Sequence, residues 1–453
     1  MLPLERSCSS GARMSRERSW TMQEDAGAVK GHSPLPTQRP RINARALLGK
    51  PARQATLRES NLNMVAAHVF AADEPVSRSA IADASGLTRA TVTRIVEILI
   101  KARILEELPP QPAGGVGRPV VPLAPARGSL VALGLEVNTA SIGACVVDLT
   151  GDVLASEVLP GNFIDSDPSL TLAQLNQLGA SVLRDAGDTS FEVVGGHLSL
   201  PGIISETTGI LHLAPLLGWR GIDARQLLGN INPIDSRAMQ LGNVTALASA
   251  AEATLRHRDG TNQNFLYVAG DNSVGSSLVI NGEPFSGMSG WNGNFGHTTI
   301  EADGLPCCCG ATGCLDTYIG RGNMAVYAGL PPDTSMASFL DQAAAHHNPR
   351  ISAALARAGN ALGIALADYV NSTPVKTIVL ADNLAQLLPW IQPQLDEQLR
   401  KRVLASPWLM PVLEPPRTSR HAAMVGGALT VLQGVIANLH ERLESKRWVS
   451  TVS

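Results

Sequence analysis

The sequence predicts an α/β fold in which a winged helix-turn-helix at residues 51–125 precedes a larger two-lobed domain at residues 129–445. Three observations lead to this prediction. The chain has 453 residues, 44% of them hydrophobic, and a single hydrophobic core stops growing near ~250–300 residues. Residues 58–125 carry three short helical patterns and two strand-like pieces. From residue 130 onward strand candidates alternate with helix candidates, which is typical of an α/β architecture.

Residues 1–50 combine Ser, Gly, Pro and Arg with too few apolar residues to bury, so we expect a disordered basic tail. Its arginines suit contact with DNA phosphates; the alternative is a solvated leader or a start codon assigned too far upstream. The formal net charge is -3, so any contact with nucleic acid must come from a local basic patch.

The N-terminus is polar and contains no apolar core of signal-peptide length. No window of the sequence sustains the ~18 apolar residues that cross a bilayer. We therefore expect a soluble, cytoplasmic protein that has no membrane partner.

The first helix after the tail has apolar positions at the spacing of a core-facing stripe, which are Leu62, Val65, Ala66 and Val69. Pro75 ends this helix. Ser77 is placed to cap a short second helix, and Gly86 forms a tight turn into a third helix that begins at Thr88. This succession predicts a helix-turn-helix.

The third helix turns four apolar residues inward, namely Val92, Ile95, Val96 and Leu99. Its N-terminal half then carries the Thr and Arg side chains that are suited to base edges and phosphates. The residues that we expect at the DNA major groove are Arg89, Thr91, Thr93 and Arg94.

Two strand-like pieces follow, at residues 103–108 and 120–123, and the Gly-rich loop between them is predicted to form the wing. Arg118 in this loop is expected to reach a phosphate or the minor groove, with its largest effect at A·T-rich flanks. The alternative is that the three helices and the hairpin serve a protein contact instead of DNA.

In the larger domain the strand candidates are residues 130–136, 141–148, 191–200, 265–269, 276–281 and 376–381. The helix candidates are residues 170–186, 224–230, 245–257, 336–347, 350–371 and 421–443. Residues 149–152 supply a hairpin turn. No tandem repeat is visible in the sequence. A two-lobed fold can nevertheless contain a structural duplication that the sequence no longer shows.

Four of the six cysteines crowd into residues 307–314, which favours a metal over disulfides. Three thiolates and one imidazole form the ligand set of a closed structural zinc site, and we predict that the ligands are His297, Cys307, Cys309 and Cys314. Cys308 is expected to point away from the ion. The alternatives are an iron-sulfur centre or reduced thiols that hold no metal.

The run from Gly293 to Asp316 resembles the Gly-Glu-x-Gly-His and Cys-x-Cys-Gly-x-x-Gly-Cys-Leu-Glu signature of ROK proteins, which include bacterial sugar kinases and the glucose, xylose and N-acetylglucosamine repressors. The resemblance covers essentially residues 58–442. The helix-turn-helix and the Gly-Arg-Pro of the wing, at residues 117–119, are similar to the repressor branch. The resemblance implies a sugar-kinase-like, actin-like (ribonuclease H-like) effector domain with a structural zinc loop at residues 293–316.

Family kinases carry an Asp, eight residues before a helical Glu, that takes the proton from the attacking sugar hydroxyl. Counting back eight residues from Glu252 gives Val244, which cannot accept a proton. The glycines that let backbone N–H groups approach phosphate are also missing at the three corresponding loops, residues 136–140, 271–273 and 381–382. The resemblance therefore predicts that the chain is not an enzyme.

On the sugar side, the resemblance places Asn243, His297 and Asp316 at sugar-contacting positions, and Asn294, which replaces the Glu of the family signature, is expected to bind the ligand as well. Asp316 is one methylene shorter than the usual Glu. Without the resemblance, Asn243 fits the cap of a loop as well as a ligand contact.

We accordingly expect a sequence-specific transcriptional repressor of carbohydrate genes that is controlled by a small carbohydrate ligand. Its other expected partners are a pseudo-palindromic, A·T-rich operator and further copies of itself, since we expect a homodimer or homotetramer. The alternatives are a DNA-binding regulator whose sugar pocket is vestigial and an active ROK sugar kinase.

Overall fold

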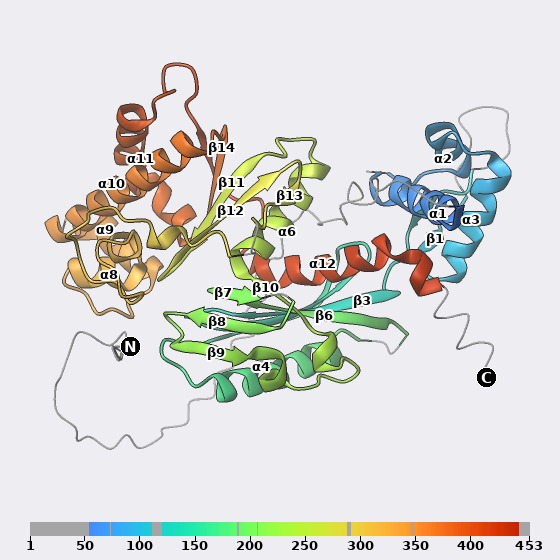
Figure 1. The fold of residues 1–453 in the computed structure, drawn as a ribbon, viewed down its shortest axis with the longest axis horizontal. Helices are drawn as coiled ribbons and strands as arrows, with labels where there is room; N and C mark the ends of the chain where they lie inside the picture. The colour runs from blue at the N-terminus through green and yellow to red at the C-terminus, as the bar shows by residue number, and fades with distance from the viewer. Residues whose placement is uncertain are drawn as a thin grey trace.

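A computed structural model describes residues 54–443, apart from positions 73, 111–119, 188, 189, 206, 288–290 and 347. A small helical unit stands at one end of the molecule, and two α/β lobes make up the rest (Figure 1). The predicted α/β fold class is confirmed.

The small helical unit contains α1 (Gln54–Phe70), α2 (Arg78–Ser85) and α3 (Arg89–Lys101). Ser77 caps α2, because its side chain accepts a hydrogen bond from the Ala80 N–H, and Thr88 caps α3 in the same way from the Thr91 N–H. Gly86 lies between the two helices with φ 72°, a left-handed conformation that glycine adopts without steric cost. The four predicted inward residues of α3 are all buried.

The strands of this unit are shorter than predicted, and the second strand lies further along the chain. β1 (Leu105–Glu107) pairs antiparallel with β2 (Leu123–Pro125), so the second strand begins where the predicted piece at 120–123 ends. An isolated bridge joins Leu123 to Val76, and the buried Leu123 side chain anchors this register in the core. The predicted wing loop and Arg118 lie outside the described residues.

The first lobe is built on a five-stranded sheet with the order β10-β6-β3-β4-β5. Its strands are β3 (Leu130–Val137), β4 (Ser141–Asp148), β5 (Val153–Pro160), β6 (Glu192–Leu200) and β10 (Gln240–Asn243). β3, β4 and β5 form an antiparallel meander, whereas β6 and β10 run parallel to β3. The Asp148 carboxylate accepts hydrogen bonds from the Thr150 and Asp152 N–H groups and so closes the hairpin turn between β4 and β5.

The second lobe repeats this topology in a five-stranded sheet with the order β13-β12-β11-β14-β15. Its strands are β11 (Phe265–Gly270), β12 (Val274–Ile280), β13 (Glu283–Pro284), β14 (Thr377–Asp382) and β15 (Val412–Glu414). Again the first three strands are antiparallel and the last two are parallel to the first. The two lobes are therefore a structural duplication.

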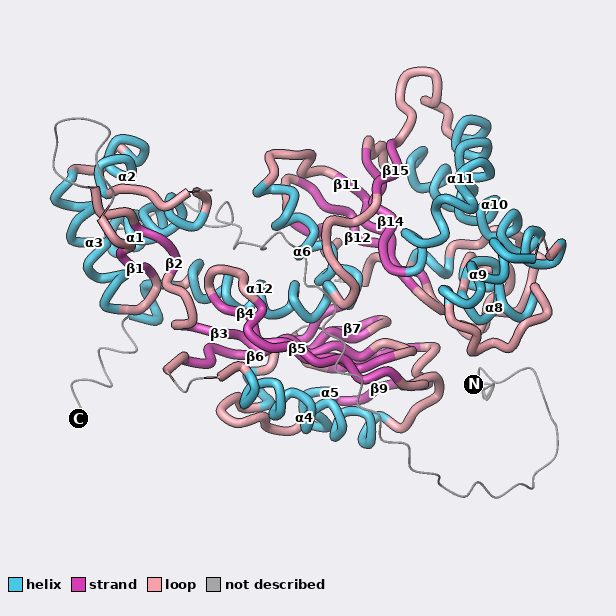
Figure 2. Tube along the Cα trace, turned by 180° about the vertical axis from the view of Figure 1, so that it is seen from behind, coloured by secondary structure: helices cyan, strands magenta, loops and turns pink. Residues whose placement is uncertain are grey.

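The helices lie on the faces of these sheets. Figure 2 shows α4 (Pro168–Asp185) and α5 (Ala224–Leu228) below the first sheet, with α12 (Ala422–Ala437) on its other face. α6 (Val244–Arg258) packs against α12, and the second lobe adds α7 (Asp316–Ile319), α8 (Arg321–Tyr327), α9 (Met336–His346), α10 (Pro349–Ser372) and α11 (Asn383–Arg402). A three-stranded sheet of β7 (Ile203–Ser205), β8 (Ile210–Ala214) and β9 (Trp219–Asp223) completes the first lobe.

α12 sits unusually close to its neighbours because glycines face it. A Cβ atom at Gly134 in β3 would lie 1.9 Å from the Met424 carbonyl oxygen. Gly426 of α12 itself approaches α6, since a Cβ there would lie 1.9 Å from the Leu247 oxygen. Both contacts require glycine and fix the position of α12 between the first sheet and α6.

One hydrophobic cluster joins the small helical unit to the first lobe. It contains Val65 of α1, Val96 of α3, Val147 of β4 and Leu432 of α12, all fully buried. The small unit therefore shares a core with the lobe instead of resting on it by a polar contact. Among the described helices, none is long and apolar enough to cross a membrane.

Candidate functional site

A cavity of about 330 Å³ opens between the two lobes. It is lined by the carboxyl ends of β3, β6, β11 and β14 and by the starts of α6 and α12. Ligands of α/β proteins bind at this end of the strands, because the loops that follow parallel strands meet there. We therefore take this cavity as the candidate ligand site.

One side of the cavity is formed by the loop at residues 293–316, here named the zinc-loop wall, which contributes Gly293, Asn294, His297 and Cys309 to the lining. The four predicted metal ligands converge within this loop, and their ligand atoms all lie within 4.8 Å of one another. The Cys309 and Cys314 sulfurs are 3.7 Å apart, and the Cys307 sulfur is 3.6 Å from His297 Nδ1. Two thiolates bound to one zinc ion at ~2.3 Å lie roughly 3.8 Å apart in a tetrahedron, so the cluster fits that ion.

The local backbone explains why these ligands meet. Short bridges pair Thr299 with Cys314 and Pro306 with Thr312, which folds the loop back on itself. Gly313 permits this with φ 69°, and a Cβ atom there would lie 1.6 Å from the Glu301 oxygen. A hydrogen bond with Cys308 is the largest influence on the Cys307 thiol, and together with the His297 bond it lowers the pKa of Cys307 to about 3, which favours the thiolate that binds metals. Cys308 itself does not belong to the converging set.

The structure brings three of the four predicted sugar-contacting residues to the cavity, namely Asn243, Asn294 and His297. Asn243 also caps α6, because its Oδ1 accepts hydrogen bonds from the Thr245 and Ala246 N–H groups. Asn294 donates from Nδ2 to the Trp291 oxygen at 2.8 Å, and the Trp291 ring meets His212 of β8 edge to face, which ties the zinc-loop wall to the first lobe.

Asp316 is not part of the cavity lining. Its buried carboxylate accepts hydrogen bonds from the Ser273 hydroxyl at 2.7 Å and the Val274 N–H at 2.8 Å, and Gly296 packs directly against it. Burial raises the pKa of Asp316 to about 6. In this arrangement Asp316 fastens the loop of Ser273 to the zinc loop.

The cavity is also lined by three acidic residues at the ends of β3, β11 and β14, in the segments that correspond to the phosphate loops of a kinase. This carboxylate wall consists of Glu136, Asp271 and Asp382. Sequence reasoning recognised these loops as unfit for ATP but did not assign the acidic residues to a ligand. The signal was present, because acidic residues stand in or beside all three loops that lack the family's glycines.

Asp382 adopts φ 53° and ψ −128°, a backbone conformation that glycine favours and that costs other residues about 1–3 kcal/mol. Burial, followed by the charge of Glu136, raises the pKa of its carboxyl to about 6. His421 also has a positive φ of 63°, and its Nδ1 lies 3.7 Å from Glu136 Oε1. The carboxylate wall is thus held in a strained and electrostatically costly arrangement, which is typical of functional sites.

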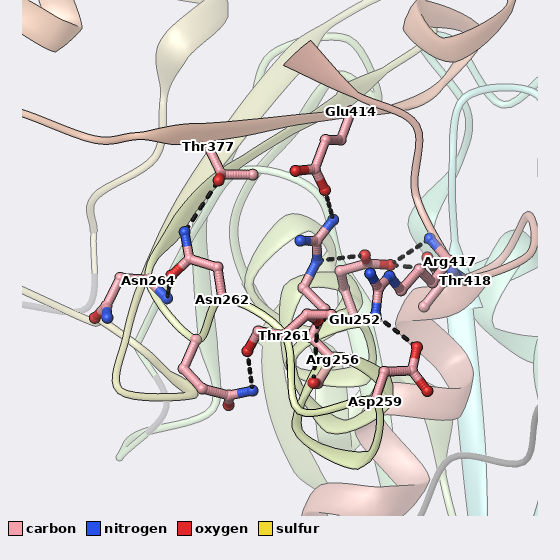
Figure 3. Close-up of polar contacts among 11 residues, drawn as sticks. Glu252, Arg256, Asp259, Thr261, Asn262, Asn264, Thr377, Glu414, Arg417 and Thr418 are labelled. Atoms are coloured by element: carbon pink, nitrogen blue, oxygen red, sulfur yellow. Dashed lines mark hydrogen bonds and ion pairs between the residues drawn. The ribbon is translucent and has the colours of Figure 1, made fainter. Parts of the chain in front are cut away.

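A buried ion-pair network places the segment that leads to His421 (Figure 3). Glu252 of α6 accepts from Arg256 Nε at 2.8 Å and from the backbone N–H groups of Arg417 and Thr418 at 2.8 and 3.0 Å. Arg256 also pairs with Glu414 of β15 at 2.9 Å. Because Glu252 and Arg256 are almost completely buried, losing either partner would leave an uncompensated charge in the core.

The predicted DNA-contacting residues of α3 lie at its N-terminal half. Arg89 and Arg94 are exposed, and Thr91 and Thr93 are half-buried. The Thr91 hydroxyl hydrogen-bonds with that of Thr88 at 2.9 Å, and the Thr93 hydroxyl donates to the Arg89 carbonyl at 2.8 Å. The two arginines are therefore the freer side chains for an outside partner.

The model of the ROK family matches residues 132–434, so the chain belongs to the ROK family. It is similar to the xylose repressor of Bacillus subtilis, with 23% identity over 362 residues that cover 80% of this chain and 92% of that protein. In fold it resembles the crystal structure of a ROK family transcriptional regulator, a homologue of the E. coli Mlc protein, with a TM-score of 0.68, 21% identity and coverage of 86% of this chain and 99% of that one. It also resembles the ROK hexokinase of Thermus thermophilus, with a TM-score of 0.54, 22% identity and coverage of 67% and 99%. The family thus contains both repressors and kinases.

Proposed function

We propose that the chain is a DNA-binding transcriptional repressor of carbohydrate genes, that a small sugar in the cavity controls its affinity for DNA, and that it has no kinase activity. The names of the similar repressors support the first part, and the similarity extends over 80% of this chain for the xylose repressor and 86% for the ROK regulator structure. The position of α12, between the cavity and the small helical unit, is the observation on which the whole proposal rests.

The N-terminal end of α12 lies at the cavity, where His421, Ala422 and Ala423 form part of the lining. About 24 Å further along, at a rise of ~1.5 Å per residue, the other end contacts the small helical unit, because Asn63 of α1 donates to the Ala437 carbonyl at 3.3 Å. A ligand that moves the first turn of α12 therefore acts on the unit that carries α3. A ligand shifts such an equilibrium only by the difference of its affinities for the two arrangements.

Two features support the absence of kinase activity. Val244, at the first position of α6, lines the cavity where a kinase needs a general base, and its side chain cannot accept a proton. Asp271 and Asp382 replace glycines of the kinases' phosphate loops, which removes the small residues that let backbone N–H groups approach phosphate, and the acidic side chain of Asp382 opposes a nucleotide phosphate.

The zinc-loop wall is proposed to contain one structural Zn²⁺ per chain, bound by His297, Cys307, Cys309 and Cys314. The ion would fix the loop that presents Asn294 to the cavity. Asn243, Asn294 and His297 are proposed to hydrogen-bond the sugar hydroxyls, with Asp316 as a positioning residue behind them.

DNA contact is proposed for Arg89, Thr91, Thr93 and Arg94 of α3 and for Arg118 of the predicted wing. A homodimer or homotetramer reading a pseudo-palindromic operator would place two α3 helices about one helical turn of DNA apart.

A mobility-shift assay with the full chain and DNA from its own promoter region tests this proposal. The R89A/R94A double variant should bind at least 10-fold more weakly, about 1.4 kcal/mol or more, whereas R184A on the exposed face of α4 should bind as wild type does. Equal binding by all three proteins contradicts the DNA assignment.

Coupling is tested on the same DNA with a panel of sugars, by measuring whether a sugar that binds also changes DNA affinity. N63L should retain sugar binding and lose most of the sugar effect on DNA. A panel in which no sugar binds would favour the vestigial-pocket alternative, and sugar-dependent ATP consumption would favour the kinase.

A further inference from the structure

The charged side chains that line the cavity are mostly acidic. Glu136, Asp271 and Asp382 contribute three carboxylates, His297 and His421 contribute two imidazoles, and none of the described lining residues is Lys or Arg. A phosphorylated ligand normally needs Arg, Lys or the N-terminus of a helix.

Two arginines near the carboxylate wall already bind other groups of the protein. Arg321 pairs with Asp271 at 2.7 Å and also donates to the Thr334 carbonyl at 2.7 Å. Arg420 donates to Asn383 Oδ1 at 3.1 Å. Neither arginine lines the cavity.

Three helices begin at the cavity, and at two of them N–H groups of the first turn already donate to a side-chain oxygen of the protein. At α6, Asn243 Oδ1 accepts from two N–H groups of the first turn. At α12, Glu136 Oε2 accepts from the Met424 N–H at 3.3 Å. At α11, Asp382 is the N-cap residue; its side chain makes no capping hydrogen bond, but it places an acidic group at this end of the helix. At α6 and α12 the backbone donors that bind phosphate elsewhere are therefore occupied by the protein's own acceptors, and at α11 an acidic residue stands at the positive end of the helix dipole.

From this arrangement we infer that the ligand of the cavity is a sugar without a phosphate or other anionic group, and that Glu136 and Asp382, whose carboxylates are not paired with an arginine among the described residues, are the residues that set this specificity. The inference rests on the proposed function, because it concerns the ligand of the same site. Carboxylates accept hydrogen bonds from sugar hydroxyls, and they repel an added anion in a partly desolvated cavity. The carboxylate wall therefore separates a free sugar from its phosphate ester, which is the product of sugar phosphorylation.

Calorimetric titration of the full chain with matched pairs tests this inference. The pairs are glucose with glucose 6-phosphate and glucose 1-phosphate, and N-acetylglucosamine with its 6-phosphate. The free sugar of any pair that binds should bind at least 10-fold more tightly than its ester. An ester that binds as tightly as its parent sugar, or more tightly, overturns the inference while the proposed function stands.

Charge-neutral variants identify the residues responsible. E136Q and D382N keep an oxygen acceptor at each position but remove one charge, so each should reduce the ratio of sugar to ester affinity at least 3-fold. D185N, an exposed carboxyl at the end of α4, removes the same charge outside the cavity and should leave the ratio unchanged. An unchanged ratio in both cavity variants overturns the role of the carboxylate wall. If neither member of any pair binds, the proposed function itself fails, and the inference fails with it.

Discussion

The two walls of the cavity are held in place by different forces. On the zinc-loop wall, Asn294 and His297 sit on an irregular loop with little regular secondary structure, and the loop is folded back by short bridges around four metal-ligand side chains. On the carboxylate wall, Glu136 and Asp382 belong to β3 and β14, two strands of five-stranded sheets. The first wall should therefore depend on one ion, whereas the second is fixed by the fold and contributes selectivity through charge.

The largest expected effect is the loss of the zinc-loop wall in C314A. Cys314 is fully buried, so the variant should lose zinc, unfold with a free energy lower by several kcal/mol and lose the sugar response. C308S is the matched control, since Cys308 is adjacent to the ligand set but is not part of it. Elemental analysis and thermal unfolding measure the outcome. A full equivalent of zinc in C314A would show that the ligand set is wrong.

A smaller effect is expected on the carboxylate wall. Burial and Glu136 raise the pKa of Asp382 to about 6, so the folded chain binds this proton more tightly than the unfolded chain does. The ionised carboxyl group thus reduces stability as the pH rises from about 4 to about 6 and above. D382N should raise the free energy of unfolding by about 1–3 kcal/mol at pH 8, and this gain should disappear near pH 4. Denaturant unfolding of D382N and D185N at both pH values gives the comparison, and a less stable D382N at pH 8 would contradict it.

The specificity of the carboxylate wall should also depend on pH. Asp382 faces Glu136, Asp271, His421 and Arg420, and it loses its charge near pH 6. Burial acts to lower the pKa of His421, but its interaction with Glu136 outweighs burial and raises the pKa, which favours the positively charged imidazolium form beside the wall. Glucose 6-sulfate keeps one negative charge over this pH range and serves as the probe. The ratio of glucose affinity to glucose 6-sulfate affinity should shrink about 3- to 10-fold between pH 8 and pH 5.5. In D382N this shrinkage should be largely absent.

The smallest expected effect is that of V244D. An aspartate at the first position of α6 suits the helix dipole and restores a proton acceptor at the cavity. Because the carboxylate wall still opposes nucleotide phosphates, we expect no sugar-dependent ATP consumption above background. Turnover in V244D would show that the base alone separates this chain from the kinases.

Several elements could be predicted from the sequence because local chemistry specifies them. Ser77, Gly86 and Thr88 mark the turns around α2 and α3 through caps and a positive φ. The cluster of His297, Cys307, Cys309 and Cys314 could be recognised because the spacing is short and these side chains have few other uses in such a cluster.

Other elements were missed because tertiary packing overrides a local signal. α11 contains Pro389 and Pro393, which predict a break, yet it continues for 20 residues. It does so because Leu384, Leu387 and Ile391 are buried in the core of the second lobe, and this burial outweighs the lost backbone hydrogen bonds. The short sheet of β7, β8 and β9 and the short helices α7 and α8 have too few residues for a periodic pattern.

By itself the sequence determined the fold class, the family resemblance and the residues of the His/Cys cluster, since each depends on residue type and short spacing. Only the tertiary structure decided that Asp316 lies behind the cavity, that Glu136 and Asp382 face each other across 246 positions of sequence, and that α12 joins the cavity to α1. These relations depend on how strands of two lobes end at one place. Contacts between residues so far apart along the chain leave no periodic pattern from which they could be read.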